Sequence, residues 1–195
     1  MHRFILSVLI VALVAAPGAA QQLDLVFDPA RTVIEFTLDA TLHKVHGTFE
    51  LVRGTVLYDP ATGEVSGAIV IDARSGDTGN DKRDRDMHSK VLESDTHPTI
   101  EFVPELVVGD FPVAGKGDVK VVGSFRVGGR EHPVEIPLDL TVTGADVEIR
   151  GQFEVPYVEW GLEDPSKFVL RVAKEVVVTI TAHATVTPAT VEEAN

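Results

Sequence analysis

Residues 134–155 read VEIPLDLTVTGADVEIRGQFEV and contain two segments in which apolar and polar residues alternate. The first segment puts these apolar residues on one face of a strand: Val134, Ile136, Leu138, Leu140 and Val142. The second does the same with Val147, Ile149, Phe153 and Val155. A period of two is typical of a strand with one buried face. Because Thr143-Gly144-Ala145 suits a tight turn, the stretch predicts an antiparallel hairpin.

The same period recurs from Arg31 to the end of the chain. Further runs are Ile34/Phe36/Leu38, Val45/Phe49/Leu51, Ile69/Ile71, Ile100/Phe102, Val119/Val121/Phe125/Val127 and Val176/Val178/Ile180. Turn-forming residues separate several of them, at 59–63, 109–112 and 128–129. About eight short strands with this spacing predict an all-β fold, a sandwich or a barrel. A single domain without a linker is expected, since no longer repeat is visible.

Two segments break the alternation. Residues 81–93 predict a short amphipathic helix near one end of the β domain. Asn80, just before them, can cap the helix, and Met87 and Val91 share one of its faces. Residues 157–174 predict a long loop, which carries the only tryptophan, Trp160.

The N-terminus has the features of a secretory signal peptide: a basic start, an apolar run over residues 4–16 and small residues at 18–20. This run is too short to cross a bilayer as a helix, which takes about 20 residues. We therefore expect cleavage near Ala20 and a periplasmic or secreted protein, with one domain over residues 21–187. The small, acidic residues 188–195 predict a flexible tail.

The charge balance limits the partners. The 195 residues include 30 acidic and 17 basic side chains, a formal net charge of -13. Nucleic acid and anionic membrane surfaces would repel such a chain, so we expect no nucleic-acid partner and no stable membrane insertion. The absence of cysteine excludes disulfides and thiolate chemistry.

The inward faces of the predicted strands are aliphatic, with several phenylalanines and almost no ionisable side chain. Composition alone favours a packed core, although a barrel with eight strands can also enclose one slender ligand. A cavity with this lining would suit a long hydrocarbon, since burying an unpaired polar group there would cost several kcal/mol.

Motifs for catalysis are weak. Gly-x-Ser-x-Gly, a Walker A loop and His-Glu-x-x-His are absent. His43-x-x-His46 has a spacing seen in metal sites, but two residues three apart on a strand point to opposite faces. In the mixed-charge segment 78–86, the planar fork of Arg83 suits a phosphate or carbonyl head group, while Asp84 offers the alternative of an internal salt bridge.

Several motifs together resemble those of the YceI-like family, the polyisoprenoid-binding, lipocalin-like proteins of bacteria. They are Thr78-Gly79-Asn80, Arg83-Asp84, Ser89, the segment 97–102 (HPTIEF), Phe36 with 45–49 (VHGTF), 54–60 (GTVLYDP) and the hairpin 123–134. The similarity covers residues 26–186. Asp39-Ala40 and Asp86 stand where the family usually has histidines, which leaves the ligand head group open.

The resemblance implies an eight-stranded antiparallel lipocalin-like barrel with a long apolar pore and a short helix near the opening. The expected ligand is an isoprenoid quinone, a polyprenyl lipid or a fatty amide, without a cofactor or a catalytic role. The expected contacts are Ile34, Phe36, Phe49, Leu51, Ile69, Ile71, Asn80, Arg83, Phe102, Phe125, Leu138, Leu140, Phe153 and Trp160. Two alternatives remain: a structural or stress-response barrel with a filled core, and a metal-dependent hydrolase using His43 and His46. The oligomeric state, a homodimer included, is open.

Overall fold

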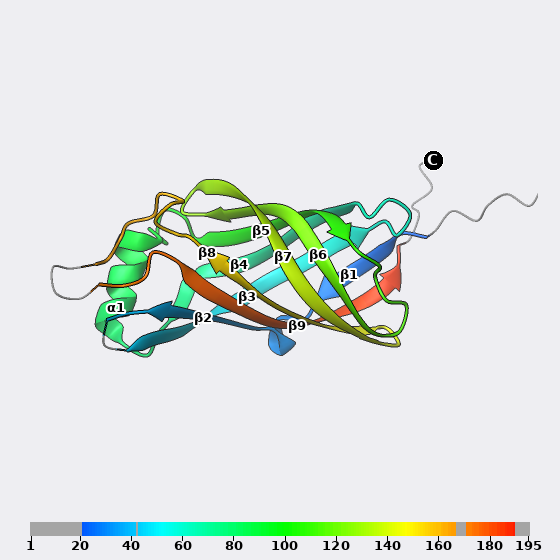
Figure 1. Ribbon diagram of the computed structural model, residues 1–195, viewed down its shortest axis with the longest axis horizontal. Coiled ribbons are helices and arrows are strands. Elements are labelled where there is room, and N and C mark those ends of the chain that lie inside the picture. Colours follow the sequence, from blue (N-terminus) through cyan, green and yellow to red (C-terminus); the bar gives the residue numbers. More distant parts are fainter. Residues whose placement is uncertain (1–20, 42, 167–170, 190–195) are drawn as a thin grey trace, which may run out of the picture.

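The computed structural model describes residues 21–41, 43–166 and 171–189. Its strands form one antiparallel sheet, which closes into a barrel because β3 pairs with β4 as well as with β1 and β2 (Figure 1). The strands are β1 (Leu23–Phe27), β2 (Val33–Asp39), β3 (Lys44–Tyr58), β4 (Val65–Asp77), β5 (Thr99–Val108), β6 (Gly115–Val127), β7 (Arg130–Thr143), β8 (Asp146–Val155) and β9 (Val176–Pro188).

β1 and β2 together occupy one strand position of the barrel. β1 pairs with one part of β3 and β9, and β2 pairs with another part of the same two strands. The short 3-10 helix η1 (Pro29–Arg31) lies between them. The barrel therefore has eight strand positions, which confirms the predicted architecture. The alternation predicted no strand before Arg31, because β1 is only five residues long and ends at the Asp28-Pro29 turn.

Side-chain contacts hold η1 in place between β1 and β2. Arg31 Nη1 donates to Asp146 Oδ1 at 2.7 Å, and Arg31 Nη2 lies 2.6 Å from His183 Nδ1. The Arg31 guanidinium lowers the pKa of Asp146 below its ordinary value, and His183 adds to the effect. These contacts tie η1 to β8 and β9.

The hairpin of residues 134–155 forms with the predicted turn. Val142 lies opposite Val147, and Gly144 in the turn has a φ of 62°, which favours glycine. Farther along, Leu138 lies opposite Gly151, where a Cβ would come within 2.6 Å of Leu138 Cδ2. Glycine at 151 thus makes room for the inward leucine.

The predicted helix is present. α1 (Asp81–Asp86) and the π-helical η2 (Met87–Val91) follow one another and lie across one end of the barrel (Figure 1). The Asn80 side chain caps the first turn by accepting a hydrogen bond from the Arg83 backbone N–H at 3.1 Å. His88 Nε2 donates to the Gly76 carbonyl at 2.9 Å, which fixes the helical segment to β4.

The last strand, β9, reaches into the predicted tail. β9 continues to Pro188, and the Ala189 N–H donates to the Gln22 carbonyl at 2.8 Å, so the first two residues of the predicted tail pack against the barrel end. The predicted signal peptide and residues 190–195 lie outside the described residues. Within the described part, no helix has the length and apolar character needed to span a membrane.

Candidate ligand-binding cavity

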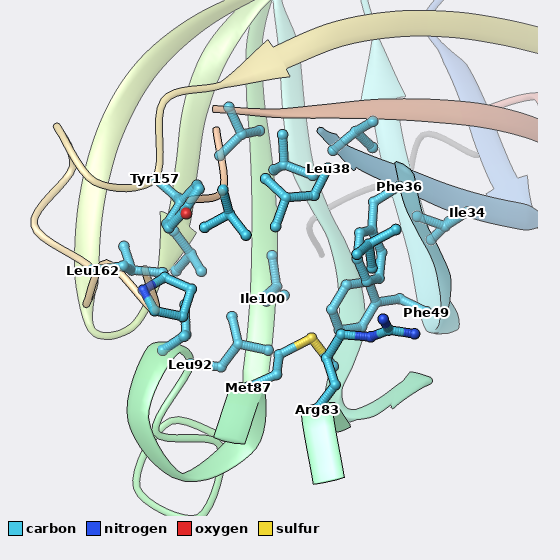
Figure 2. Close-up of a pocket in the computed structure, with 18 of the residues that line it drawn as sticks. Ile34, Phe36, Leu38, Phe49, Arg83, Met87, Leu92, Ile100, Tyr157 and Leu162 are labelled. Carbon is cyan, nitrogen blue, oxygen red and sulfur yellow. The ribbon is translucent and has the colours of Figure 1, made fainter. Parts of the chain in front are cut away.

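A cavity of about 410 Å³ lies inside the barrel at the end covered by α1, and we call it the helix-end cavity. This volume is in the range of small-molecule sites, roughly 300–1,000 Å³. Figure 2 shows Phe36, Phe49 and Met87 converging on the same space. The apolar lining consists of Ile34, Phe36, Leu38, Val45, Phe49, Ile71, Met87, Val91, Leu92, Ile100, Phe125, Val127, Phe153, Val155, Tyr157, Leu162, Pro165, Val172, Val176, Val178 and Ile180.

One wall of this cavity depends on a glycine. Phe36 of β2 lies opposite Gly47 of β3, and its ring centroid is 5.3 Å from that of Phe49. A Cβ at position 47 would lie 2.4 Å from Phe36 Cζ. The missing side chain therefore lets the Phe36 ring lie against β3 beside Phe49.

A second, narrower cavity of about 130 Å³ adjoins the first, and we call it the central cavity. The two cavities share Ile34, Ile71, Phe125, Phe153 and Ile180 in their walls. No charged side chain of the described residues lines the central cavity. The barrel thus encloses an apolar space with a larger volume under the helix and a smaller one in the middle, rather than a completely filled core.

The structure brings most of the predicted contacts to these cavities. Ile34, Phe125, Ile71 and Phe153 line both. The others divide between them: Phe36, Phe49, Asn80 and Arg83 line the helix-end cavity, and Leu51, Ile69, Phe102, Leu138 and Leu140 line the central cavity. The role of these side chains as ligand contacts stays a prediction.

Trp160 is placed differently. It is absent from the walls of both cavities and stacks on His132, with ring centroids 4.4 Å apart and planes 3° from parallel. Its ring centroid also lies 5.8 Å from that of Phe125. The buried Nε2 of His132 has no hydrogen-bond partner among the described residues. Trp160 therefore supports the wall behind Phe125.

Charged side chains lie at the helix-end cavity, since Lys82, Arg83 and Asp86 are part of its wall, and two of the three are cationic. Arg83 Nε donates to Thr78 Oγ1 at 2.7 Å and Nη2 donates to the Thr78 carbonyl at 2.9 Å. Figure 2 shows the Arg83 guanidinium beside Phe49. Because these two bonds use only part of the donor fork, the guanidinium can still donate to a ligand.

The alternative of a salt bridge between Arg83 and Asp84 is not what the structure shows. Asp84 Oδ1 instead accepts hydrogen bonds from the Thr78 backbone N–H and hydroxyl, and no carboxylate of the described residues forms a salt bridge with Arg83. Partial burial opposes ionisation of Asp84, but the Thr78 hydrogen bonds and nearby Arg83 still hold its pKa below the ordinary value. The Thr78 hydroxyl thus links the side chains of Arg83 and Asp84 through hydrogen bonds.

Sequence reasoning missed the lining residues of the irregular segment after β8. Tyr157, Leu162, Pro165 and Val172 line the helix-end cavity, but no periodic pattern marks them. The Tyr157 hydroxyl donates to the Ala173 carbonyl at 2.8 Å, and burial, assisted by Asp164, raises its pKa to about 12. By contrast, Met87 and Val91 line the cavity from the helix face that their spacing predicted.

The histidine pair of the hydrolase alternative does not form a metal centre in the described residues, which contain no cluster of three or more His, Asp or Glu with suitable geometry. His46 Nδ1 lies 3.1 Å from Thr37 Oγ1 on the exposed face of β3.

A closed antiparallel barrel with an apolar interior cavity and a helix over one end defines the class of lipocalin-like barrels. The chain belongs to the YceI-like domain family, whose model matches residues 25–184. No curated protein matches the chain.

Solved structures are similar in fold. BcnA of Burkholderia cenocepacia is 22% identical with a TM-score of 0.69, and the match covers 82% of this chain and 99% of that one. A polyisoprenoid-binding domain of Saccharophagus degradans, implicated in plant cell wall breakdown, is 16% identical with a TM-score of 0.66, covering 84% and 98%. The YceI protein of Campylobacter jejuni is 11% identical with a TM-score of 0.54, covering 95% and 98%.

Proposed function

We propose that this protein is a carrier or storage protein that holds a long-chain isoprenoid, such as a quinone or a polyprenyl lipid, or a similar amphiphile such as a fatty amide, inside its barrel. The observation that carries the proposal is the pair of adjoining apolar cavities, in which the charged lining residues Lys82, Arg83 and Asp86 all lie at the helix end. The similarity in fold to the polyisoprenoid-binding domain of Saccharophagus degradans supports it.

The tail and the head of such a ligand would bind by different forces. Each 100 Å² of tail surface removed from water contributes about 2.5 kcal/mol, so a long chain gains most of its affinity in the cavities. The head group would stay at the helix end, where Lys82 and the free donors of Arg83 can bind a phosphate or a carbonyl oxygen.

The test is a melting-temperature series with an isoprenoid quinone and a polyprenyl phosphate, each compared with its soluble head group lacking the tail. A ligand that binds only the folded state raises the melting temperature with concentration. We expect both tailed compounds to raise it and the tail-free head groups to leave it almost unchanged. No shift with any tailed compound would contradict the proposal and favour a structural barrel.

We also propose that residues 1–20 direct export and are removed near Ala20. Intact-mass measurement on protein from the periplasm and the culture medium should find a chain that begins near Gln21. Recovery of full-length protein from the cytoplasm alone would contradict export without affecting the ligand proposal.

A further inference from the structure

A third cavity, of about 590 Å³, lies at the end of the barrel opposite the helix, and we call it the far-end cavity. Its wall includes the turn between β3 and β4, the 109–113 segment between β5 and β6, and the β7–β8 turn at Gly144. Figure 1 shows these turns at the end away from α1. Along β3, Val45 lines the helix-end cavity and Tyr58 the far-end cavity.

Two aromatic rings stand between the central and far-end cavities. Tyr58 of β3 and Phe111 of the β5–β6 loop both line the central cavity and the far-end cavity, together with Val107. Their ring centroids are 5.4 Å apart, and the rings are tilted by 40°. Tyr58 is 6% exposed, so the barrel wall holds it, whereas Phe111 comes from a loop.

The cavities at the two ends of the barrel differ in charge. Among the described residues the only charged side chain lining the far-end cavity is Asp110, whereas at the helix-end cavity two cations, Lys82 and Arg83, outnumber the one carboxylate, Asp86. Burial, and then the carboxylates of Asp110 and Asp59, raise the pKa of Tyr58. An anionic head group is therefore repelled from the far end, a carbonyl head group finds its cationic hydrogen-bond donors only at the helix end, and the end of the tail approaches the two rings.

We propose that the Tyr58–Phe111 pair is the tail stop of the barrel and sets the longest chain that binds fully inside it. This inference rests on the proposed function. The scale is consistent with a long tail: the 15 residues of β3 span roughly 48 Å along the strand, or about 37 Å along the axis for a strand tilt near 40°. Removing the Phe111 ring would join the central cavity to the far-end cavity and give longer tails room.

The experiment measures binding of isoprenoid quinones of increasing side-chain length by quenching of Trp160 fluorescence, in the wild type and in Phe111→Ala. In the wild type, affinity should rise with each added unit and then level off. In Phe111→Ala, the levelling should occur at longer chains, so the ratio of long-chain to short-chain affinity should rise at least about tenfold. The matched control is Val108→Ala, a neighbouring β5 residue that is 48% exposed and lines none of the three cavities.

The outcomes separate the two proposals. Binding by the wild type with the same length limit in Phe111→Ala would overturn the tail stop and leave the proposed function standing. Absence of binding at every chain length in the wild type would overturn the proposed function and the tail stop together. If the melting temperature shows that Phe111→Ala is poorly folded, Phe111→Leu, which keeps an apolar side chain but removes the ring, is measured instead and should shift the limit in the same direction.

Discussion

The helix-end cavity and the central cavity are built from the same barrel strands, but they differ in volume and in the charge of their lining. Under the helix the cavity measures about 410 Å³ and includes Lys82, Arg83 and Asp86 in its wall, whereas the central cavity measures about 130 Å³ and has no charged side chain among its described lining. An amphiphile has the same division between a polar head and an apolar tail. Under the proposed function, the strands would determine what tail fits and the helix would determine which head group binds.

The largest expected effect comes from closing the space between the two cavities. Phe125 lines both, so Phe125→Trp should block the tail and reduce the bound lipid of the purified protein at least about tenfold, at a stability cost of about 1–3 kcal/mol for overpacking. Lipid content is measured by mass spectrometry. Val52→Trp, on an exposed β3 position, is the matched control. Unchanged lipid in Phe125→Trp would contradict the assignment of the pore.

Leu138→Trp tests the central cavity separately, because Leu138 lines that cavity and not the helix-end cavity. This variant should still bind short-tailed amphiphiles at the helix end and lose long-tailed ones. Competition between a short and a long quinone measures the preference. Equal loss of both would show that the two cavities act as one undivided site.

Stability should also separate the two regions. Leu140 is 3% exposed in the central wall, so Leu140→Ala should lower the free energy of unfolding by about 2–5 kcal/mol. Leu38 is only partly buried beside the wider cavity, so Leu38→Ala should lower it by less. Urea unfolding of the delipidated protein measures both. Equal losses would indicate that the helix end is as tightly packed as the middle.

The head-group effect should be smaller and selective. Arg83→Ala should weaken binding of a polyprenyl phosphate by about 1.5–3 kcal/mol and leave binding of a tail without a polar head almost unchanged. Arg85 of the same helix does not line the cavity, and Arg85→Ala is the matched control. Titration calorimetry with both compounds measures the difference. A similar loss for the headless tail would place the effect of Arg83 in packing rather than in head-group binding.

The smallest expected effect concerns Asp84, whose pKa is lowered despite partial burial. A carboxyl with a lowered pKa stabilises the folded state above the ordinary aspartate pKa, and this contribution is lost as the pH falls through the folded-state value. The protection factors for hydrogen exchange in residues 78–91, which are corrected for the intrinsic pH dependence of exchange, should therefore fall in acid in the wild type, and Asp84→Asn should lack this pH-dependent step. Asp81→Asn, in the same turn, is the control. The same acid response in wild type and Asp84→Asn would contradict this role.

The regular part of the molecule could be predicted because each strand has one buried face. Alternation in 134–155 identifies the hairpin and its inward residues, and the same reasoning found Phe36, Phe125 and Phe153 on the cavity wall. Asn80 could be recognised as a helix cap because the chemistry of a cap is local.

The remainder depends on contacts between distant segments. Tyr157 and Leu162 line the cavity from an irregular segment without a period, and Trp160, predicted as a ligand contact, instead stacks on His132. Composition cannot distinguish a filled barrel from a hollow one, because the same apolar side chains serve both. The resemblance to the YceI-like family supplied that distinction, and the cavities agree with it.

Under the proposed function, the barrel holds a single amphiphile with its head at the helix end. Mass spectrometry of an organic extract from protein purified without detergent tests it most directly. We expect one polar-headed, long-chain lipid in close to equimolar amount, reduced in Phe125→Trp and retained in Val52→Trp. An empty extract, followed by no melting shift with quinone, polyprenyl phosphate or fatty amide, would contradict it.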